Sequence, residues 1–232
     1  MFFYFLMYVY NTVKNFITPP SVKPGEIISI EADIGAGKST FLRLLKKYYP
    51  DKFCIVYEPL DKWLENSEEE NDNILGLLYK DTKRWAYTFQ HNAFLTRVQK
   101  IEEERDDSKV IFSERSVLSD YNVFAKMLRD DKLMNDIEYK IYLNWMNFLM
   151  KKHNTLPKKI VYLRTTPETS HKRLLKRNRN EEKGVSLEYL QKVNKYHEEW
   201  LNGMDNVVVL DGDQEFEENE ERFKEMVAKI FN

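Results

Sequence analysis

The chain has 232 residues, 42% of them hydrophobic and 32% charged, and a net charge of −2. This is the profile of one folded globular domain, and the slight acidic excess disfavours a general nucleic-acid or anionic-membrane binder, so we expect no nucleic-acid partner. The single cysteine, Cys54, excludes a disulfide within the chain and favours a reducing compartment, so we expect a cytoplasmic protein with Cys54 buried in a strand.

The first 24 residues are predicted to form an N-terminal extension. It opens with the apolar run MFFYFLMYVY, which is too short to span a bilayer. It lacks the basic flank and the cleavage site of a secretory signal, and Pro19, Pro20 and Pro24 end it. We expect residues 1–24 to be poorly ordered or weakly associated, without stable membrane insertion; a weak membrane contact is the alternative. The main domain is expected over residues 25–232.

Five short β-branched runs then alternate with longer helical segments. The runs are EIISIEA, KFCIVYE, KVIFSER, KIVYLRT and NVVVLDG, at residues 26–32, 52–58, 109–115, 159–165 and 206–212. Their nearly continuous apolar character is typical of strands covered on both faces. The segments between them are too long for hairpins, so we predict an α/β fold with a five-stranded parallel sheet flanked by helices. Ligands bind outside the carboxyl ends of the strands in such a sheet.

The first run leads into a sequence that is nearly a phosphate-binding loop. The stretch ADIGAGKST matches the pattern GxxxxGK[ST] except that Ala32 replaces the opening glycine, a mild change if the local φ is negative. Lys38 would reach the β and γ phosphates of ATP, and Ser39 would hold Mg²⁺. The stretch predicts a P-loop NTPase-type domain, with a plain glycine-rich turn as the alternative. The predicted ATP-binding residues are Ala32, Asp33, Ile34, Gly35, Ala36, Gly37, Lys38, Ser39 and Thr40.

Charged side chains end the next two runs. Glu58 is placed to take a proton from an attacking hydroxyl, although it could instead cap the helix PLDKWLEN. Glu114 and Arg115 follow the third run; Glu114 could hold Mg²⁺ while Arg115 positions Glu58 and the phosphates. A plain salt bridge between these two neighbours is the alternative.

The segment RWAYTFQHNAFLTRVQKIEEE predicts a helix that binds a flat ring. Gln90, Ala93 and Arg97 are three and four residues apart, so they face one side. The Gln90 amide could pair with the edge of a nucleobase. Phe89 and Phe124 could sandwich the ring, or they could be ordinary core residues.

The basic run HKRLLKRNRNEEKG predicts an arginine-rich lid. It contains Arg173, Arg177 and Arg179, and the first two share a helix face. Guanidinium groups on a mobile flap can close over a transferring phosphoryl group and exclude water. A solvated basic helix end is the alternative.

Taken together, these residues resemble the deoxynucleoside kinases, the deoxycytidine and deoxyguanosine kinase group. The similarity runs from Glu26 to the C-terminus and includes the phosphate loop, EPLDKW, RWAYTFQ, ERSVLSD, TPET, RNRNEEKG and LEYL in order. The resemblance implies a kinase domain over residues 25–232 that moves the γ-phosphate of ATP to the 5′-hydroxyl of a deoxynucleoside, for nucleotide salvage. A thymidylate kinase-like nucleoside monophosphate kinase, a non-catalytic relative such as an accessory subunit of respiratory complex I, and a GTP switch are the competing interpretations.

The resemblance also implies roles on the phosphate side of the site. Glu58 would take the 5′-hydroxyl proton with Arg115 as its arginine partner, and Glu114 and Ser39 would hold Mg²⁺. The chain departs from the family at Ala32 and at Asp33, where many members carry asparagine, and both changes would tune ATP affinity. The residues that would act on the phosphoryl group are Lys38, Arg115, Arg173, Arg177 and Arg179.

On the acceptor side, the resemblance implies that Tyr79 and Glu182 hold the sugar 3′-hydroxyl and that Gln90 grips the base. Arg97 and Asp120 would form an ion pair at the pocket floor, which suits amino groups and is unfavourable for the thymine methyl. We therefore expect deoxycytidine, deoxyadenosine or deoxyguanosine to be preferred over thymidine; an ion pair that does not contact the ligand is the alternative. The predicted substrate-binding residues are Glu58, Leu75, Tyr79, Phe89, Gln90, Ala93, Arg97, Arg115, Asp120, Phe124 and Glu182.

Two further segments, residues 134–153 and the stretch DGDQEFEENEE, also allow predictions. Residues 134–153 are aromatic and methionine-rich around much of the helix circumference, which is typical of a buried helix or half of an interface. Because the family packs two helices per subunit into a four-helix bundle, we expect a homodimer, with the helix of Gln90 as the other contributor. The acidic stretch DGDQEFEENEE lacks calcium-loop spacing, and the resemblance places it beside the ATP base, near Phe216.

Overall fold

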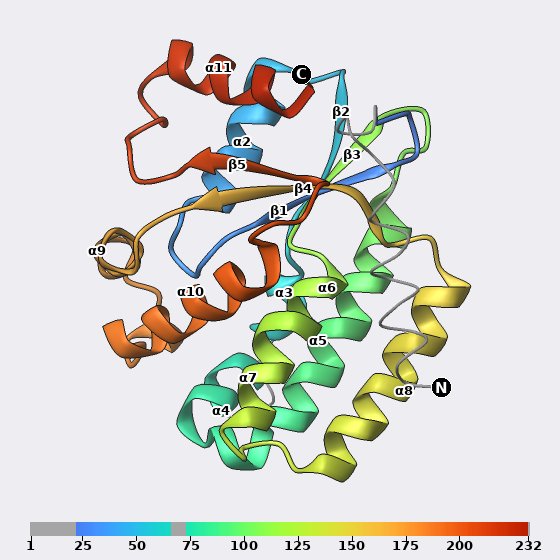
Figure 1. The fold of residues 1–232 in the computed structure, drawn as a ribbon, viewed down its shortest axis with the longest axis vertical. Helices are drawn as coiled ribbons and strands as arrows, with labels where there is room; N and C mark the ends of the chain where they lie inside the picture. The colour runs from blue at the N-terminus through green and yellow to red at the C-terminus, as the bar shows by residue number, and fades with distance from the viewer. Residues whose placement is uncertain (1–21, 66–72, 232) are drawn as a thin grey trace.

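A five-stranded parallel sheet forms the centre of the chain. The computed structural model describes residues 22–65 and 73–231, so nearly all of the predicted N-terminal extension lies outside the described residues. The strands, in the order β2-β3-β1-β4-β5 across the sheet (Figure 1), are β1 (Ile27–Glu31), β2 (Phe53–Val56), β3 (Val110–Glu114), β4 (Pro157–Arg164) and β5 (Val207–Asp211). All neighbouring strands pair in parallel, which confirms the predicted α/β fold.

Helices cover both faces of this sheet (Figure 1). On one face lie α2 (Lys38–Tyr48) and α11 (Glu220–Phe231), and on the other lie α5 (Thr82–Glu104) and α10 (Leu187–Leu201), with α8 (Asp136–Lys152) packed outside α5. The shorter elements are α3 (Leu60–Trp63), α4 (Ile74–Lys80), α6 (Val117–Ser119), the π-helix η1 (Asp120–Ala125), α7 (Lys126–Asp130), α9 (Pro167–Arg177) and the 3₁₀-helix η2 (Asn180–Glu182).

The central strand β1 anchors both layers of the core. Ile28 and Ile30 pack with Phe41 of α2 and Phe223 of α11, whereas Ile27 packs with α5 on the other face. This alternation follows from the two-residue period of a strand, and it explains why β1 reads as one continuous apolar run. Every residue of β1 is buried, so the segment that follows it starts from a fixed position.

The pairing register aligns the functional segments at one edge. Ile30 pairs with Glu114, and Val56 pairs with Ser113, so the carboxyl ends of β1, β2 and β3 lie side by side. Because the chain order reverses beside β1, this edge is the crevice where open α/β sheets bind ligands. The phosphate loop, Glu58 and Arg115 all emerge there.

The expectation that all five strands are covered on both faces is wrong at the sheet edges. Val209 of the edge strand β5 is 48% exposed, and Cys54 of the opposite edge strand is only half-buried. An edge strand lacks a neighbour on one side, so helices cover it less completely. The Cys54 thiol donates to the Glu104 carbonyl at 3.2 Å, and burial raises its pKa.

Local capping sets where the helices begin. The Asn135 side chain accepts from the backbone of Glu138 while the Glu138 side chain accepts from the backbone of Asn135, a capping box that starts α8. Thr166 caps α9, whose first residue is Pro167. None of the helices described in this chain combines the length and apolarity that crossing a membrane requires.

Candidate active site

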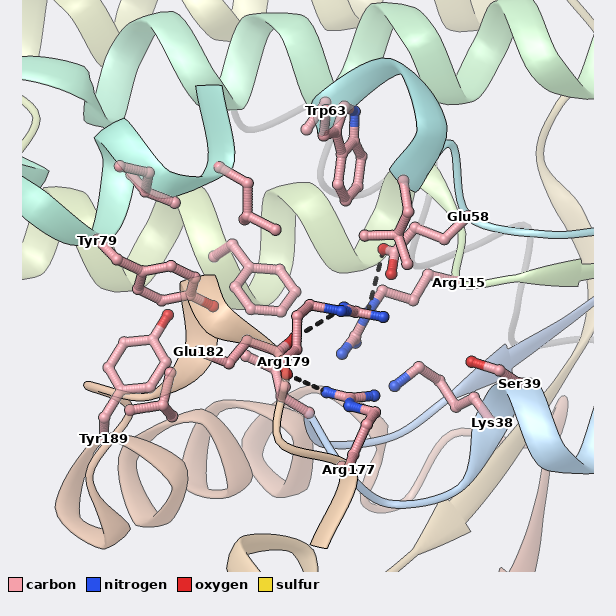
Figure 2. Close-up of a pocket in the computed structure, with 18 of the residues that line it drawn as sticks. Lys38, Ser39, Glu58, Trp63, Tyr79, Arg115, Arg177, Arg179, Glu182 and Tyr189 are labelled. Atoms are coloured by element: carbon pink, nitrogen blue, oxygen red, sulfur yellow. Dashed lines mark hydrogen bonds and ion pairs between the residues drawn. The ribbon is translucent and has the colours of Figure 1, made fainter. Parts of the chain in front are cut away.

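A cavity of about 750 Å³ opens at the carboxyl edge of the sheet (Figure 2). Its walls come from the phosphate loop, the ends of β2 and β3, one side of α5, and the segment from α9 to α10. It brings together almost all of the site residues that the sequence predicts, namely Ile34, Gly35, Gly37, Lys38, Ser39, Thr40, Glu58, Leu75, Tyr79, Phe89, Gln90, Ala93, Arg97, Glu114, Arg115, Asp120, Phe124, Arg173, Arg177, Arg179 and Glu182.

The phosphate loop closes on the first turn of α2. Gly37 caps this helix with a φ of 106°, a left-handed conformation that glycine adopts without strain. The Lys38 ammonium donates to the Asp33 carbonyl at 2.8 Å, so the loop's own backbone holds this cation. Burial, and next the charge of Arg115, lower the pKa of Lys38 to about 7.

Three loop residues that the sequence assigned to ATP do not line the cavity. Ala32 and Ala36 are fully buried in the main hydrophobic core, which explains why alanine is accepted at the loop's entrance. The Asp33 carboxylate points toward α10, where it accepts from Asn194 at 2.8 Å and lies 3.0 Å from His197. These side chains therefore support the loop from behind.

Glu58 faces the cavity from the end of β2. Pro59 occupies the cap position of α3, so the alternative that Glu58 caps this helix is wrong. The Glu58 carboxylate accepts from Arg97 at 2.9 Å and lies 3.5 Å from the Arg115 guanidinium. Burial alone would raise the pKa of Glu58, but the charges of Arg97, Arg115 and Lys38 outweigh it and lower the pKa below its usual value.

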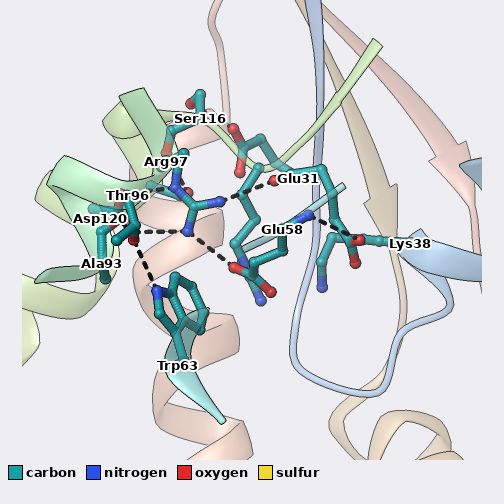
Figure 3. Close-up of polar contacts among 12 residues, drawn as sticks. Glu31, Lys38, Glu58, Trp63, Ala93, Thr96, Arg97, Ser116 and Asp120 are labelled. Carbon is teal, nitrogen blue, oxygen red and sulfur yellow. Dashed lines mark hydrogen bonds and ion pairs between the residues drawn. The ribbon is translucent and has the colours of Figure 1, made fainter. Parts of the chain in front are cut away.

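Arg97 is the hub of the polar network at the cavity floor (Figure 3). Its guanidinium donates to both carboxylate oxygens of Asp120, at 2.9 and 3.1 Å, to the Glu114 carbonyl at 3.0 Å, and to Glu58. Asp120 is the first residue of the π-helix η1, an element that is often found at functional sites. The predicted ion pair of Arg97 and Asp120 is present, whereas the hydrogen bond from Arg97 to Glu58 was not predicted from the sequence.

Glu114 and Arg115 enter the same cavity although they are neighbours at a strand end. Side chains of consecutive strand residues point to opposite faces. Arg115 has a φ of 63°, which turns the chain at this residue, and its N–H donates to the Ile30 carbonyl at 3.0 Å. Glu114 accepts from the Ser39 hydroxyl at 2.6 Å, so the two predicted Mg²⁺ ligands lie together.

The three predicted lid arginines divide into two groups. Arg173 donates to the backbone carbonyls of Ala36, Gly212 and Asp213, at 2.7 to 3.3 Å, so it ties α9 to the phosphate loop. Arg177 and Arg179 both donate to the Glu182 carboxylate (Figure 2). Glu182 is 4% exposed, so this triplet is a built cluster and not a solvated helix end.

The part of the cavity beside α5 is lined largely by apolar side chains, including Leu75, Phe89, Ala93 and Phe124. Gln90 and Ala93 lie on the cavity side of α5 together with Arg97, as the helical spacing predicts. The Gln90 side-chain oxygen is buried and has no hydrogen-bond partner among the described residues, so it can serve a ligand. Phe89 and Phe124 both line this space.

Two aromatic residues of the cavity were missing from the predicted site. Trp63 packs edge to face on Phe89, with ring centroids 5.4 Å apart, and donates to the Thr96 hydroxyl at 2.9 Å. Tyr189 lies opposite Tyr79 (Figure 2), and burial, followed by the neighbouring Tyr189, raises the pKa of Tyr79 well above its usual value. Trp63 ends the motif EPLDKW and Tyr189 lies in LEYL, so the signal was present in both cases.

Phe216 lines the cavity at the end formed by the phosphate loop. The residue is 3% exposed and packs against Phe41 with a centroid distance of 6.1 Å. Its ring would lie 3.2 Å from a Cβ added at Gly37, so only glycine leaves this contact unstrained. Phe216 thus lies directly against the phosphate loop.

The fold and the cavity define a kinase of the phosphate-binding-loop class. The family model described as "Deoxynucleoside kinase" matches residues 28–232, and the chain belongs to this family. The fold and enzyme class that the sequence resemblance implied are therefore confirmed, and the non-catalytic and GTP-switch interpretations are wrong.

Curated relatives agree with this assignment. The chain is 40% identical over 196 residues to "Deoxycytidine kinase 2" of Gallus gallus, covering 75% of this chain and 73% of the relative. It is 37% identical over 194 residues to "Deoxycytidine kinase" of Homo sapiens, covering 75% and 74%. It is also 36% identical over 221 residues to "Deoxyguanosine kinase, mitochondrial" of Xenopus laevis, covering 83% of each chain.

The lowered pKa of Lys38 predicts that productive ATP binding weakens as the pH rises. In the free enzyme the pKa of Lys38 is about 7, whereas a bound phosphate favours the charged ammonium, so ATP binding takes up a proton above that pH. The pH dependence of kcat/KM for ATP reflects pKa values of the free enzyme, so we expect kcat/KM to decrease from about pH 7 to about pH 9. The value of kcat reflects the enzyme–substrate complex, so it should begin to decrease only at a higher pH. A kcat/KM for ATP that stays constant or increases over this range would contradict the prediction.

Proposed function

We propose that the protein transfers the γ-phosphate of ATP to the 5′-hydroxyl of a deoxynucleoside, with Glu58 as the general base. The observation that carries this proposal is the position of Glu58, which faces one cavity together with Lys38 and Arg115. In the reaction a bond forms between the 5′-oxygen and the γ-phosphorus, and the bond from the γ-phosphorus to the β–γ bridging oxygen breaks. The 5′-hydroxyl proton passes to Glu58, and ADP leaves.

The charge around Glu58 fits this role. Its lowered pKa keeps the carboxylate ionised at neutral pH, so it is ready to accept a hydrogen bond from the hydroxyl and orient it. Lys38, Arg115, Arg177 and Arg179 point toward one another across the cavity (Figure 2). On this proposal these cations stabilise the charge that develops on the phosphoryl oxygens.

Ser39 and Glu114 would hold Mg²⁺. Their hydroxyl and carboxylate oxygens are 2.6 Å apart, and oxygen is the ligand type that Mg²⁺ prefers. No group of three or more His, Cys, Asp or Glu side chains within residues 22–65 and 73–231 could form an all-protein metal cage. This fits Mg²⁺, which is usually held by one or two carboxylates, substrate phosphates and water. When bound, the ion neutralises charge on the β and γ phosphates.

The acceptor end supports a neutral nucleoside over a nucleoside monophosphate. The Arg97 guanidinium is already matched by the carboxylates of Asp120 and Glu58, so it offers no net positive charge to an acceptor phosphate. On our proposal Tyr79 and Glu182 bind the sugar 3′-hydroxyl and Gln90 binds the base between Phe89 and Phe124. The relatives named as deoxycytidine and deoxyguanosine kinases support the same acceptor class.

The pocket floor further supports deoxycytidine and the purine deoxynucleosides over thymidine. Base amino groups can donate to the carboxylate of Asp120, whereas the thymine methyl would desolvate the ion pair without replacing its hydrogen bonds. The residues facing this space include Leu75 and Ala93, which leave room for the ring. A role in nucleotide salvage follows from such an activity, and the single cysteine fits a reducing, cytoplasmic setting.

A homodimer is also part of the proposal. Helix α8 buries Tyr142, Leu143 and Met146 against α5 but leaves a stripe of large apolar side chains exposed. The exposed fractions are 72% for Ile137, 39% for Ile141, 52% for Trp145 and 55% for Phe148. These positions recur at helical spacing on one face, and a contiguous apolar stripe of this kind marks an interaction surface.

Replacing Glu58 tests the assignment of the base. Glu58→Gln keeps the shape of the side chain but removes its proton affinity and its attraction for Arg97 and Arg115, so we expect kcat to fall about a hundredfold or more. Formation of 5′-monophosphate from ATP, Mg²⁺ and each deoxynucleoside is the measurement. Glu103→Gln alters an exposed carboxylate on α5 and should leave kcat unchanged. Undiminished turnover by Glu58→Gln would remove Glu58 from its role.

Acceptor preference is tested on the unmodified protein. We expect at least one of deoxycytidine, deoxyadenosine and deoxyguanosine to give a higher kcat/KM than thymidine, because only these bases present amino groups to Asp120. Asp120→Ala should reduce this preference, so that kcat/KM for thymidine increases relative to kcat/KM for the other three deoxynucleosides. A higher kcat/KM for thymidine than for all three others would refute the specificity argument.

The dimer is tested by sedimentation. We expect the protein to sediment at twice the 28.0 kDa mass of one chain at micromolar concentration. The double variant Trp145→Glu, Phe148→Glu should dissociate it, because each change buries a charge in an apolar contact. Leu175→Glu, at a residue of α9 that is 57% exposed, is the matched control and should leave the mass unchanged. A monomeric unmodified protein would overturn this part of the proposal.

A further inference from the structure

A buried histidine lies behind Arg115, on the side away from the cavity. His197 of α10 is 0% exposed. Its Nε2 lies 3.4 Å from the Arg115 Nη1, and its Nδ1 lies 3.0 Å from both the Asp33 carboxylate and the Val193 carbonyl. His197 therefore links the phosphate loop to the arginine beside Glu58.

The partners of His197 fix its tautomer. The Val193 carbonyl can only accept a hydrogen bond, so it requires the ring proton on Nδ1, and the negative charge of the Asp33 carboxylate 3.0 Å away favours the proton on the same nitrogen. In the neutral ring Nε2 then presents a lone pair to Arg115, whose guanidinium can only donate. The hydrogen-bond direction thus runs from Arg115 to His197, and from His197 to the backbone of Val193 beside Asp33.

Packing fixes the orientation of the ring. Tyr162 stacks on it at a centroid distance of 6.1 Å and an interplanar angle of 11°, and Phe124 meets it edge to face at 6.4 Å and 87°. Asn194 donates to the Asp33 carboxylate at 2.8 Å, so this anchor is itself held. A ring held in this way can act as a rigid acceptor.

Arg115 needs such an acceptor because its guanidinium is otherwise held loosely. The guanidinium lies 3.5 Å from the Glu58 carboxylate and 4.9 Å from the centre of the Phe124 ring, and the residue is 3% exposed. Without His197 a buried N–H on the side away from the cavity would lose its acceptor. The side chain could then regain hydrogen bonds by rotating out of alignment with Glu58.

We propose that His197 is a positioning residue that accepts a hydrogen bond from Arg115 and aims its guanidinium at Glu58 and the transferred phosphoryl group. This inference rests on the proposed function. It gives Asp33 a role as well, because its carboxylate lies 3.0 Å from Nδ1 and its charge favours the tautomer that the Val193 carbonyl requires. The loop that binds the donor and the arginine that serves the reaction are thus coupled through one buried ring.

Two amide substitutions of His197 distinguish a role in positioning Arg115 from a role in packing alone. In His197→Asn the amide reaches only as far as Nδ1 does, toward Asp33 and Val193, so Arg115 loses its acceptor. In His197→Gln the amide oxygen reaches the position of Nε2 and can accept from Arg115. Since hydrogen bonds to charged groups contribute more than neutral ones, we expect kcat to fall about tenfold in His197→Asn and to stay within about threefold in His197→Gln. KM for ATP and for deoxycytidine should change less than kcat.

The controls distinguish this inference from the proposed function. Tyr162→Phe keeps the ring stacked on His197 and should leave kcat unchanged, and thermal unfolding shows whether each variant is folded. Kinase activity of the unmodified protein tests the proposed function by itself. If that activity is present, equal kcat values for the folded Asn and Gln variants, or a loss confined to KM, would overturn the role of His197.

Discussion

The site depends on one guanidinium shared between two carboxylates. Arg97 binds Asp120 with two hydrogen bonds and Glu58 with a third, and the three side chains are 3 to 15% exposed. A carboxylate taken out of water tends to pick up a proton, and only a close, well-aligned cation prevents this. Removing one partner would leave an uncompensated buried charge, so the three groups function together. Under the proposed function, the same arginine would serve both the pocket for the base and Glu58, the proposed general base.

Backbone geometry brings the partners of this arginine together. Parallel pairing at the centre of the sheet aligns the ends of β1, β2 and β3, which are far apart in sequence. The left-handed conformation of Arg115 then allows Glu114 and Arg115 to serve one cavity, at a cost in local strain that the buried hydrogen bonds offset. A single long helix, α5, carries the remaining groups across the floor. The cavity thus depends on the pairing register of β1, β2 and β3 and on the turn at Arg115. Its side chains project from these strands and from α5, which are rigid elements.

Features with a local sequence signal were predictable. The five apolar runs, the phosphate loop and the spacing of Gln90, Ala93 and Arg97 each depend on neighbouring residues, and each prediction agrees with the structure. The bond from Arg97 to Glu58 depends on how far a side chain reaches between distant segments, which spacing does not encode. The orientation of the Asp33 carboxylate toward α10 and the exposure of Val209 on the edge strand β5 likewise depend on packing and strand order.

The backbone contacts of Arg173 limit how the entrance of the site can move. Three carbonyl acceptors, from the phosphate loop and from the turn after β5, hold this side chain, which lies in the second half of α9. Charge-assisted bonds of this kind hold the helix in place. The chain next changes direction at Asn178, where φ is 53°. If the predicted lid moves, its motion is therefore expected in the short segment between Asn178 and α10, because the Arg173 contacts tie α9 itself to the phosphate loop.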